Sequence, residues 1–184
     1  MDVFSERLSN PEVDQGLEHM SIRELEVLVA DDHRLTRDMV GQVLKVLECK
    51  RVRFVCDGAA AFSEIISEPP DIAIIDYDMP LDGLALLTKI RRAANSPDPT
   101  LPVIVMTSLT DVNRVRALRD SGVNEVLAKP FNAIAVLSRV AALIDHPRQF
   151  IRTRTFIGPD RRRRLAANYA GPFRRASDSN VVEL

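Results

Sequence analysis

Residues 71–80, Asp-Ile-Ala-Ile-Ile-Asp-Tyr-Asp-Met-Pro, constrain the fold of this chain more than any other stretch. The apolar run at 72–75 does not alternate with polar residues, which is typical of a short strand buried on both faces. Asp76 follows at once, and a loop with Pro80 and Gly83 comes next. In open α/β sheets, ligands bind in the crevice outside the carboxyl ends of the strands. Asp76 is therefore the first candidate functional residue.

Hydrophobic periodicity and breaker residues predict four further strands and five helices. The strands are expected over residues 25–30, 51–56, 103–106 and 125–128. The helices are expected over residues 33–48, 59–67, 84–94, 111–120 and 131–144, with Asp111 as the cap of the fourth. Strands that alternate with helices call for an α/β domain with a parallel sheet and right-handed crossovers.

Four of the five predicted strands end in polar residues that could act together, namely Asp31-Asp32, Asp76, Thr107 and Lys129. Each of these has an ordinary explanation when taken alone, such as a helix cap, a strand-end hydroxyl or a solvated surface charge. The carboxyl ends of parallel strands meet at one edge of the sheet, so all of these side chains are expected on one rim. Their joint occurrence therefore favours a site.

The chemistry of this set points to phosphoryl transfer. Carboxylates that are brought together repel one another unless a cation joins them, and Mg²⁺ binds such oxygen ligands while it keeps several waters. A carboxylate such as Asp76 can act as a nucleophile towards a phosphoryl group that the metal polarises. Lys129 would supply a positive charge to the phosphoryl oxygens, and Thr107 would supply a hydroxyl donor.

The chain resembles the receiver domain of two-component response regulators, the CheY-like family. The blocks that carry this resemblance are Val-Leu-Val-Ala-Asp31-Asp32, Ile-Ile-Asp76-Tyr-Asp-Met-Pro80, Val-Met-Thr107-Ser and Ala-Lys129-Pro130-Phe131. They occur in the family's order and cover about residues 25–145. The resemblance implies a flavodoxin-like, doubly wound fold with five parallel strands in the order 2-1-3-4-5, an order that this family itself exemplifies.

The resemblance also implies a cofactor and partners. Mg²⁺ would be held by Asp31 or Asp32, by Asp76 and by the backbone carbonyl of Asp78. Asp76 would accept its phosphoryl group from a histidine kinase or a phosphotransfer protein. The protein would then act as a switch, not as an enzyme that turns over, and would lose the phosphoryl group slowly.

In the family, the threonine and the lysine couple the phosphoryl group to the face formed by the fourth helix, the fifth strand and the fifth helix. That face is the expected contact surface for a downstream protein partner. One position departs from the family pattern, because Val126 stands three residues before Lys129, where the family usually has Tyr or Phe. We further expect Asp78 and Leu109 to tune dephosphorylation by limiting or orienting water.

Two other site assignments compete with this interpretation. His33 follows the acid pair, but one histidine among hard carboxylates does not make a zinc site, so a surface position at a helix start is expected. Asp76-Tyr77-Asp78 also matches the D-x-D motif of haloacid dehalogenase-like phosphatases. Those enzymes place the motif on their first strand and the acid pair last, whereas here the acid pair comes first.

Composition divides the chain into an N-terminal extension (residues 1–24), a receiver domain (25–146) and a basic, largely irregular C-terminal tail (147–184). The tail from Arg148 onward carries nine arginines and three acidic residues, although the whole chain has a net charge of −1. Two cysteines, no apolar leader and no long apolar run predict a cytoplasmic protein with reduced thiols.

The tail repeats the pattern aromatic-x-Gly-Pro-x-Arg-Arg, at residues 156–162 and again at 169–175. Gly-Pro is expected to mark a turn, followed each time by a pair of arginines. The tail could be a solvated segment, a docking element for a protein partner, or a binder of nucleic acid or anionic membrane. It could also act as a latch on its own acidic receiver domain. The alternative function is accordingly a receiver-like scaffold that acts through this tail.

Overall fold

Five parallel strands form the central sheet in the order β2-β1-β3-β4-β5. The strands are β1 (Glu26–Ala30), β2 (Arg51–Val55), β3 (Ile72–Asp76), β4 (Val103–Thr107) and β5 (Glu125–Ala128). The structure is a computed structural model, and it describes residues 22–80, 83–108, 112–160 and 182–183. The predicted strand order and parallel sheet are confirmed.

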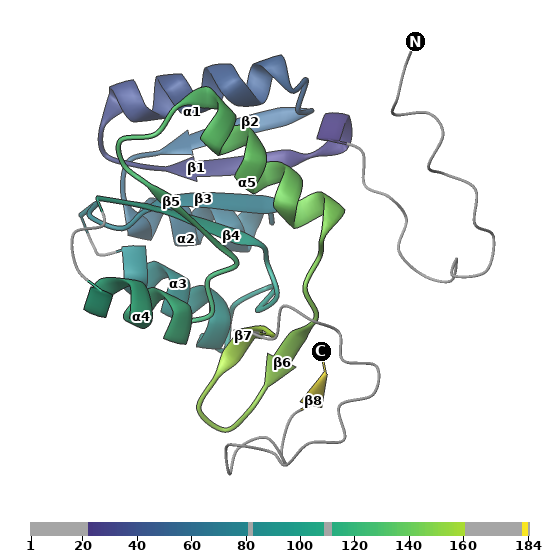
Figure 1. The fold of residues 1–184 in the computed structure, drawn as a ribbon. Helices are drawn as coiled ribbons and strands as arrows, with labels where there is room; N and C mark the ends of the chain where they lie inside the picture. Colours follow the sequence, from purple (N-terminus) through teal and green to yellow (C-terminus); the bar gives the residue numbers. More distant parts are fainter. Residues whose placement is uncertain (1–21, 81–82, 109–111, 161–181, 184) are drawn as a thin grey trace, which may run out of the picture.

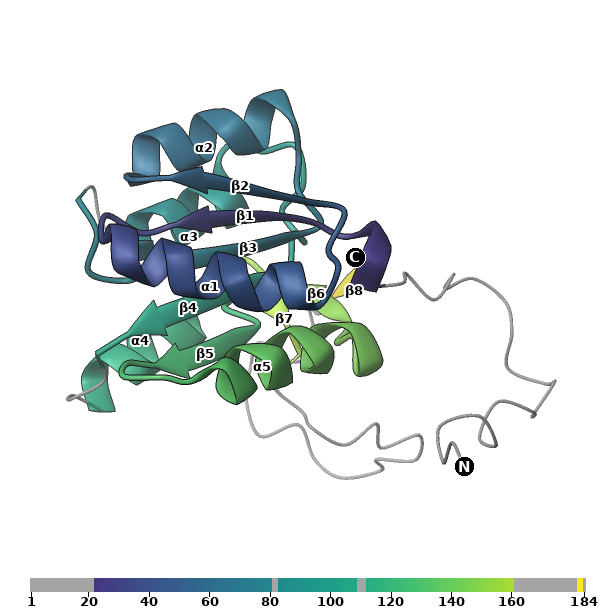
Figure 2. The same ribbon diagram turned by 90° about the horizontal axis from the view of Figure 1, so that it is seen from above.

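Helices cover both faces of this sheet (Figures 1 and 2). They are α1 (Arg34–Val46), α2 (Gly58–Ser67), α3 (Gly83–Arg92), α4 (Val112–Asp120) and α5 (Ala133–Asp145), preceded by the short 3-10 helix η1 (Ile22–Glu24). Each bound lies within two residues of the expected one, although the expected cap Asp111 lies outside the described residues. None of the helices in the described ranges is long and apolar enough to span a membrane.

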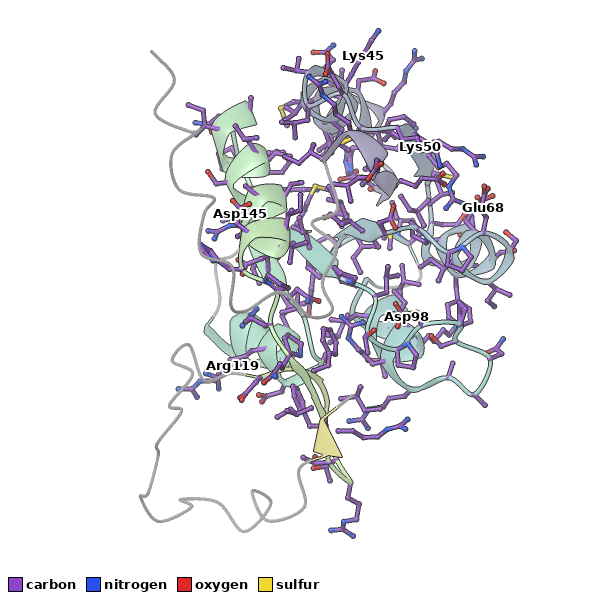
Figure 3. The ribbon with its side chains drawn as sticks, turned by 90° about the vertical axis from the view of Figure 1, so that its right-hand side faces the viewer. Lys45, Lys50, Glu68, Asp98, Arg119 and Asp145 are labelled. Carbon is purple, nitrogen blue, oxygen red and sulfur yellow. The ribbon has the colours of Figure 1, made fainter. Side chains whose placement is uncertain are left out.

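The core lies in two layers, because alternate strand residues point to opposite faces of the sheet. Leu28, Ala73 and Val105 pack with buried residues of α2, α3 and α4. Val29 and Ile74 pack on the other face with buried residues of α1 and α5. The strands β3 and β4 are buried at every residue, as expected for central strands. Charged side chains such as those of Lys45 and Lys50 lie on the outside of the layers (Figure 3).

The chain after α5 forms a β-hairpin, so the expectation of a largely irregular tail is wrong for residues 150–159. The strands β6 (Phe150–Arg152) and β7 (Ile157–Pro159) pair antiparallel, and β8 (Val182–Glu183) pairs with the other edge of β6. The turn lies at Thr153 and Phe156, whose backbone groups bond at 2.8 Å. The first Gly-Pro of the repeated motif therefore lies in a strand and not in a turn. Residues 161–181, with the second copy of the motif, lie outside the described residues.

The hairpin is anchored where β4 and β5 begin, at the end of the sheet opposite to Asp76. Arg91, at the end of α3, is only 1% exposed, and its guanidinium lies 5.0 Å from the ring of Phe150. This guanidinium donates hydrogen bonds of 2.8–3.0 Å to the backbone oxygens of Pro99, Leu101 and Gly122 and to the side-chain oxygen of Asn124. Burial lowers the pKa of Arg91 to about 9, and the charge of Asp98 opposes this shift.

Two glycines let the hairpin approach the domain backbone to backbone. Gly122 has a φ of +85°, and a Cβ built there would lie 2.2 Å from the backbone oxygen of Ile157. A Cβ on Gly158 would in turn lie 2.5 Å from the Cα of Gly122. Arg148 also donates to the backbone oxygen of Asn124. The segment 148–160 thus packs as part of the folded domain, beyond the boundary expected at residue 146.

Candidate functional site

The carboxyl ends of the strands bring the sequence-predicted polar residues to one edge of the sheet. Asp31 follows β1 and is fully buried, and Asp76, the last residue of β3, is 1% exposed. Thr107 ends β4 and is also fully buried, while Lys129 follows β5. Backbone bonds continue the pairing past the strand ends, as between Lys129 N–H and the oxygen of Thr107 at 2.8 Å. These bonds fix the positions from which the side chains project.

Lys129 joins the two buried carboxylates. Its Nζ lies 2.9 Å from Asp31 Oδ2 and 2.8 Å from Asp76 Oδ1. Burial raises the pKa of Asp76, and the repulsion from Asp31 adds to the shift, whereas Lys129 opposes it. Burial lowers the pKa of Lys129, but the bonds to Asp76 and Asp31 more than offset this effect, so its pKa is raised. The Lys129 ammonium thus lies between the carboxyl groups of Asp31 and Asp76.

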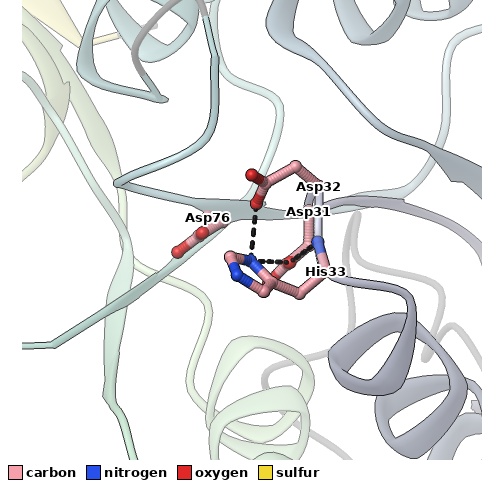
Figure 4. Close-up of side chains that lie close together, drawn as sticks. All are labelled: Asp31, Asp32, His33 and Asp76. Carbon is pink, nitrogen blue, oxygen red and sulfur yellow. Dashed lines mark hydrogen bonds and ion pairs between the residues drawn. The ribbon is translucent and has the colours of Figure 1, made fainter.

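Four side chains at this edge could together hold a metal ion. Ligand atoms of Asp31, Asp32, His33 and Asp76 all lie within 4.8 Å of one another (Figure 4). Three carboxylates with a single ammonium leave an excess of negative charge, which a divalent cation with oxygen ligands would balance. The residues present therefore fit such an ion. The position of the Asp78 carbonyl oxygen relative to this cluster stays a prediction.

Thr107 offers a hydroxyl without a hydrogen-bond partner among the described residues. Leaving such a buried group unpaired costs about 1–3 kcal/mol, so its persistence at a strand end calls for an explanation. A hydroxyl at this edge can donate to an oxygen atom of a bound group. Thr107 is therefore suited to the donor role that the sequence predicts for it.

The loop after β3 is held close to the site. A Cβ on Gly83 would lie only 2.1 Å from the backbone oxygen of Asp76, so this position requires glycine for the close return of the chain. The Asp78 backbone N–H donates to the Asp76 carboxylate and helps to keep its pKa from rising further. The Asp78 side chain accepts a hydrogen bond of 3.0 Å from Ser108. Leu109, which is expected to tune dephosphorylation together with Asp78, lies outside the described residues.

Two further side chains lie at this edge, of which only that of His33 was considered as a candidate from the sequence. Arg37, in the first turn of α1, donates a 2.6 Å hydrogen bond to the backbone oxygen of Asp31. His33 was expected at the surface of a helix start, and it is the N-terminal cap residue of α1 with a side chain that is 72% exposed. Its ring nevertheless points into the acid cluster (Figure 4). The available signals were the Asp-Asp-His run and an arginine one helical turn later.

Val126 occupies the β5 position at which the sequence departs from the family pattern. It pairs with Val105 of β4 and is half-buried against the core layer that contains α3 and α4. A branched aliphatic side chain at this position cannot swing between buried and exposed positions as a large ring can. Val126, which departs from the family pattern, is thus packed against the core of the domain.

Comparisons with known proteins agree with this geometry. The chain is 33% identical to the response regulator MprA of Mycobacterium tuberculosis over 126 residues, which cover 68% of this chain and 51% of that protein. It is 32% identical to MprA of Mycobacterium avium over 121 residues, with 65% and 51% covered. The chain therefore matches about half the length of these curated relatives.

Solved structures show the same fold. The chemotaxis response regulator CheY4 of Vibrio cholerae superimposes with a TM-score of 0.60 at 24% identity, covering 65% of this chain and 98% of that one. A CheY-like receiver domain protein from Methanospirillum hungatei gives a TM-score of 0.60 at 20% identity, with 66% and 94% covered. The family model described as "Response regulator receiver domain" matches residues 27–141. The chain therefore belongs to the response regulator receiver domain family.

Proposed function

We propose that Asp76 is the phosphoacceptor of a phosphorylation-dependent switch in a two-component system or phosphorelay. The observation that carries the proposal is the contact of Lys129 with both Asp31 and Asp76 at the acidic edge of the sheet. Membership of the family implies a histidine kinase or a phosphotransfer protein as the phosphodonor. Receiver domains bind Mg²⁺ at an acidic pocket, which here corresponds to the cluster of Asp31, Asp32 and Asp76.

In the proposed step, an oxygen of the Asp76 carboxylate attacks phosphorus, and the bond from phosphorus to the donor nitrogen breaks. The donor imidazole leaves with the electron pair of that bond. Lys129 stays beside the new acyl phosphate and balances its charge, and the Thr107 hydroxyl donates to a phosphoryl oxygen. Mg²⁺, when bound, neutralises the carboxylates and polarises the phosphoryl group. Asp31 and Asp32 would hold it with Asp76 and the Asp78 carbonyl.

We further propose that the phosphoryl group is accepted once and lost slowly, without enzymatic turnover of phosphomonoesters. The acid pair follows β1 and Asp76 ends β3, which is the receiver arrangement and not that of the haloacid dehalogenase-like alternative. Steady hydrolysis of p-nitrophenyl phosphate by the purified protein, abolished in Asp76→Asn, would instead support a phosphatase.

The test of the acceptor is incubation with acetyl phosphate or phosphoramidate and Mg²⁺, followed by intact-mass spectrometry and peptide mapping. We expect one added phosphoryl group on Asp76, none in Asp76→Asn, and normal labelling in Asp38→Asn. Asp38 is a matched control because it is an exposed carboxylate on α1, next to Arg34. Labelling that persists in Asp76→Asn would refute the assignment.

The proposed output is a protein partner that contacts the face formed by α4, β5 and α5, with the tail assisting. The alternative is a scaffold that binds nucleic acid or anionic membrane through the arginine-rich tail. The hairpin supports separating the two by truncation after Asp160, because residues 148–160 pack on the domain. Pull-down with the full chain, with Asp76→Asn and with a chain ending at Asp160 would show whether a partner depends on the phosphoryl group or on the tail.

A further inference from the structure

His33 stands between the acid pair and helix α1 with its ring turned into the acid cluster (Figure 4). The Nδ1 atom lies 2.7 Å from Asp32 Oδ1 and 3.6 Å from Asp31 Oδ1. The backbone N–H of His33 also donates to Asp31 Oδ1 at 2.7 Å, which fixes the position of the His33 backbone beside Asp31. A ring nitrogen is thus already among the carboxylate oxygens, and no rotation of the side chain is needed to bring it there.

The two oxygens of Asp31 face different neighbours. Oδ2 is taken by Lys129 at 2.9 Å, and Oδ1 lies on the side of His33 and Asp32. A cation and the ammonium would therefore contact opposite sides of one carboxylate. The imidazole is on the cation side. In the contact with the Asp32 carboxylate, which can only accept, Nδ1 carries the hydrogen, and it becomes a metal ligand when the ring takes the tautomer with its hydrogen on Nε2.

The spacing of the group suits direct coordination. Ligands around a six-coordinate ion with bonds of about 2.1 Å lie roughly 3 Å apart when adjacent and roughly 4 Å apart when opposite. The separation of 2.7 Å between His33 Nδ1 and Asp32 Oδ1 is a hydrogen-bond distance, and an increase of about 0.3 Å would bring the two atoms to the separation of adjacent ligands. The largest separation in the group, 4.8 Å, exceeds the opposite-ligand value by less than about 1 Å, which side-chain torsions can absorb.

We propose that His33 is a metal ligand that makes this site a mixed carboxylate–imidazole centre, selective for divalent transition ions over Mg²⁺. The inference rests on the proposed function, because it concerns the metal of the same site. Mg²⁺ favours oxygen ligands and water, whereas imidazole favours later first-row transition ions. With a nitrogen ligand, the site gains affinity for Mn²⁺ and, more strongly, for Co²⁺, while its affinity for Mg²⁺ changes little.

The direct test is pulsed electron paramagnetic resonance of the tag-free full chain loaded with Mn²⁺. A nitrogen bonded to Mn²⁺ gives ¹⁴N modulation in the electron spin echo, and a carboxylate or water does not. We expect this modulation in the wild type and in His19→Gln and His146→Gln, and its loss in His33→Gln. The controls replace the other two histidines of the chain; His146 is not among the four residues of the cluster, and His19 lies outside the described residues.

The second measurement is calorimetric titration with Co²⁺ and with Mg²⁺. In His33→Gln we expect the ratio of Co²⁺ to Mg²⁺ affinity to fall at least about tenfold, since even residues that only support a ligand change metal affinity by this much. Both histidine controls should keep the wild-type ratio. His33 is exposed, so the variant is expected to fold, and circular dichroism checks this.

The outcomes separate the inference from the function on which it rests. Absent ¹⁴N modulation in the wild type, or an unchanged affinity ratio in His33→Gln, would mean that His33 only bonds to Asp32, and the inference would be wrong. Labelling of Asp76 with Mg²⁺ alone would in that case leave the proposed function intact. Failure of Asp76 to be labelled with any divalent ion would count against the proposed function itself.

Discussion

Ser108 donates a 3.0 Å hydrogen bond to the carboxylate of Asp78 and so joins the residue after β4 to the loop after β3. Both residues flank the carboxyl ends of the strands that carry Thr107 and Asp76. The bond fixes the direction of a carboxylate beside the expected phosphorylation site. A fixed carboxylate can orient a water molecule for attack on an acyl phosphate.

We predict that Asp78→Asn and Ser108→Ala both lengthen the half-life of the acyl phosphate. Loss of an oriented carboxylate should slow hydrolysis by roughly threefold to tenfold, which is less than full general-base catalysis contributes. The decay of phosphorylated protein, followed by intact-mass spectrometry, measures it. If Ser108 acts through Asp78, the double variant decays no more slowly than Asp78→Asn. Equal half-lives in Asp78→Asn and the wild type would exclude this role.

Replacement of Asp76 by Asn should stabilise the fold in the absence of divalent ions. Because burial raises the pKa of Asp76, its ionisation costs more free energy in the folded than in the unfolded chain. The wild type therefore loses stability relative to Asp76→Asn as the pH rises above the ordinary value of 3.8. We expect a melting temperature a few degrees higher for the variant at pH 7 and no difference near pH 3. Scanning calorimetry in EDTA measures this, and a destabilised variant at pH 7 would contradict it.

Replacement of Lys129 by Met should destabilise the fold at neutral pH. The change removes the ammonium from Asp31 and Asp76 and leaves two buried carboxylates to repel each other. Removing one partner of a buried ion pair costs about 3–5 kcal/mol. The loss should shrink at acid pH, because the raised pKa of Asp76 lets this carboxylate take up a proton sooner as the pH falls, and it should also shrink on addition of Mg²⁺. Urea unfolding at pH 7 and pH 4 checks this, and an equal loss at both pH values would show that charge is not the cause.

Gly122→Ala should loosen the C-terminal hairpin. The substitution places a Cβ 2.2 Å from the Ile157 backbone oxygen at a φ of +85°, so the chain must shift. Strain of this kind costs about 1–3 kcal/mol. Backbone amide spectra should show changes in residues 148–160, and urea unfolding should show the loss of stability.

Gly41→Ala is a matched control for this prediction. The three atoms nearest to a new Cβ at position 41 all belong to the side chain of Phe54, which is 46% exposed and can move. Gly41 lies inside α1, where alanine is favoured over glycine by about 1 kcal/mol. We therefore expect little loss or a small gain of stability, with the hairpin signals unchanged. Equal effects of the two substitutions would show that the hairpin does not depend on its close backbone contact with Gly122.

The hairpin shows where prediction from sequence fails. Its strands β6 and β7 have three residues each, too few for a periodic pattern to stand out. The groups that stabilise it, Arg91 and Gly122, come from parts of the chain far from Phe150. Its existence depends on contacts that form only after the domain has folded. Local turn chemistry alone predicts a turn at the first Gly-Pro pair, whereas the structure places it in β7.

The sequence by itself determined where the strands and helices lie and the edge of the sheet to which Asp31, Asp76, Thr107 and Lys129 come, whereas the strand order was implied by the resemblance to the receiver domain family. Buried strands require continuous apolar runs, and parallel strands end at one edge, so both follow from local pattern. Only the tertiary structure decided that the Lys129 ammonium contacts both Asp31 and Asp76, that the exposed ring of His33 turns towards Asp31 and Asp32, and that the hairpin joins the domain. These features depend on side-chain directions and on contacts between residues distant in the chain, which a one-dimensional pattern does not contain.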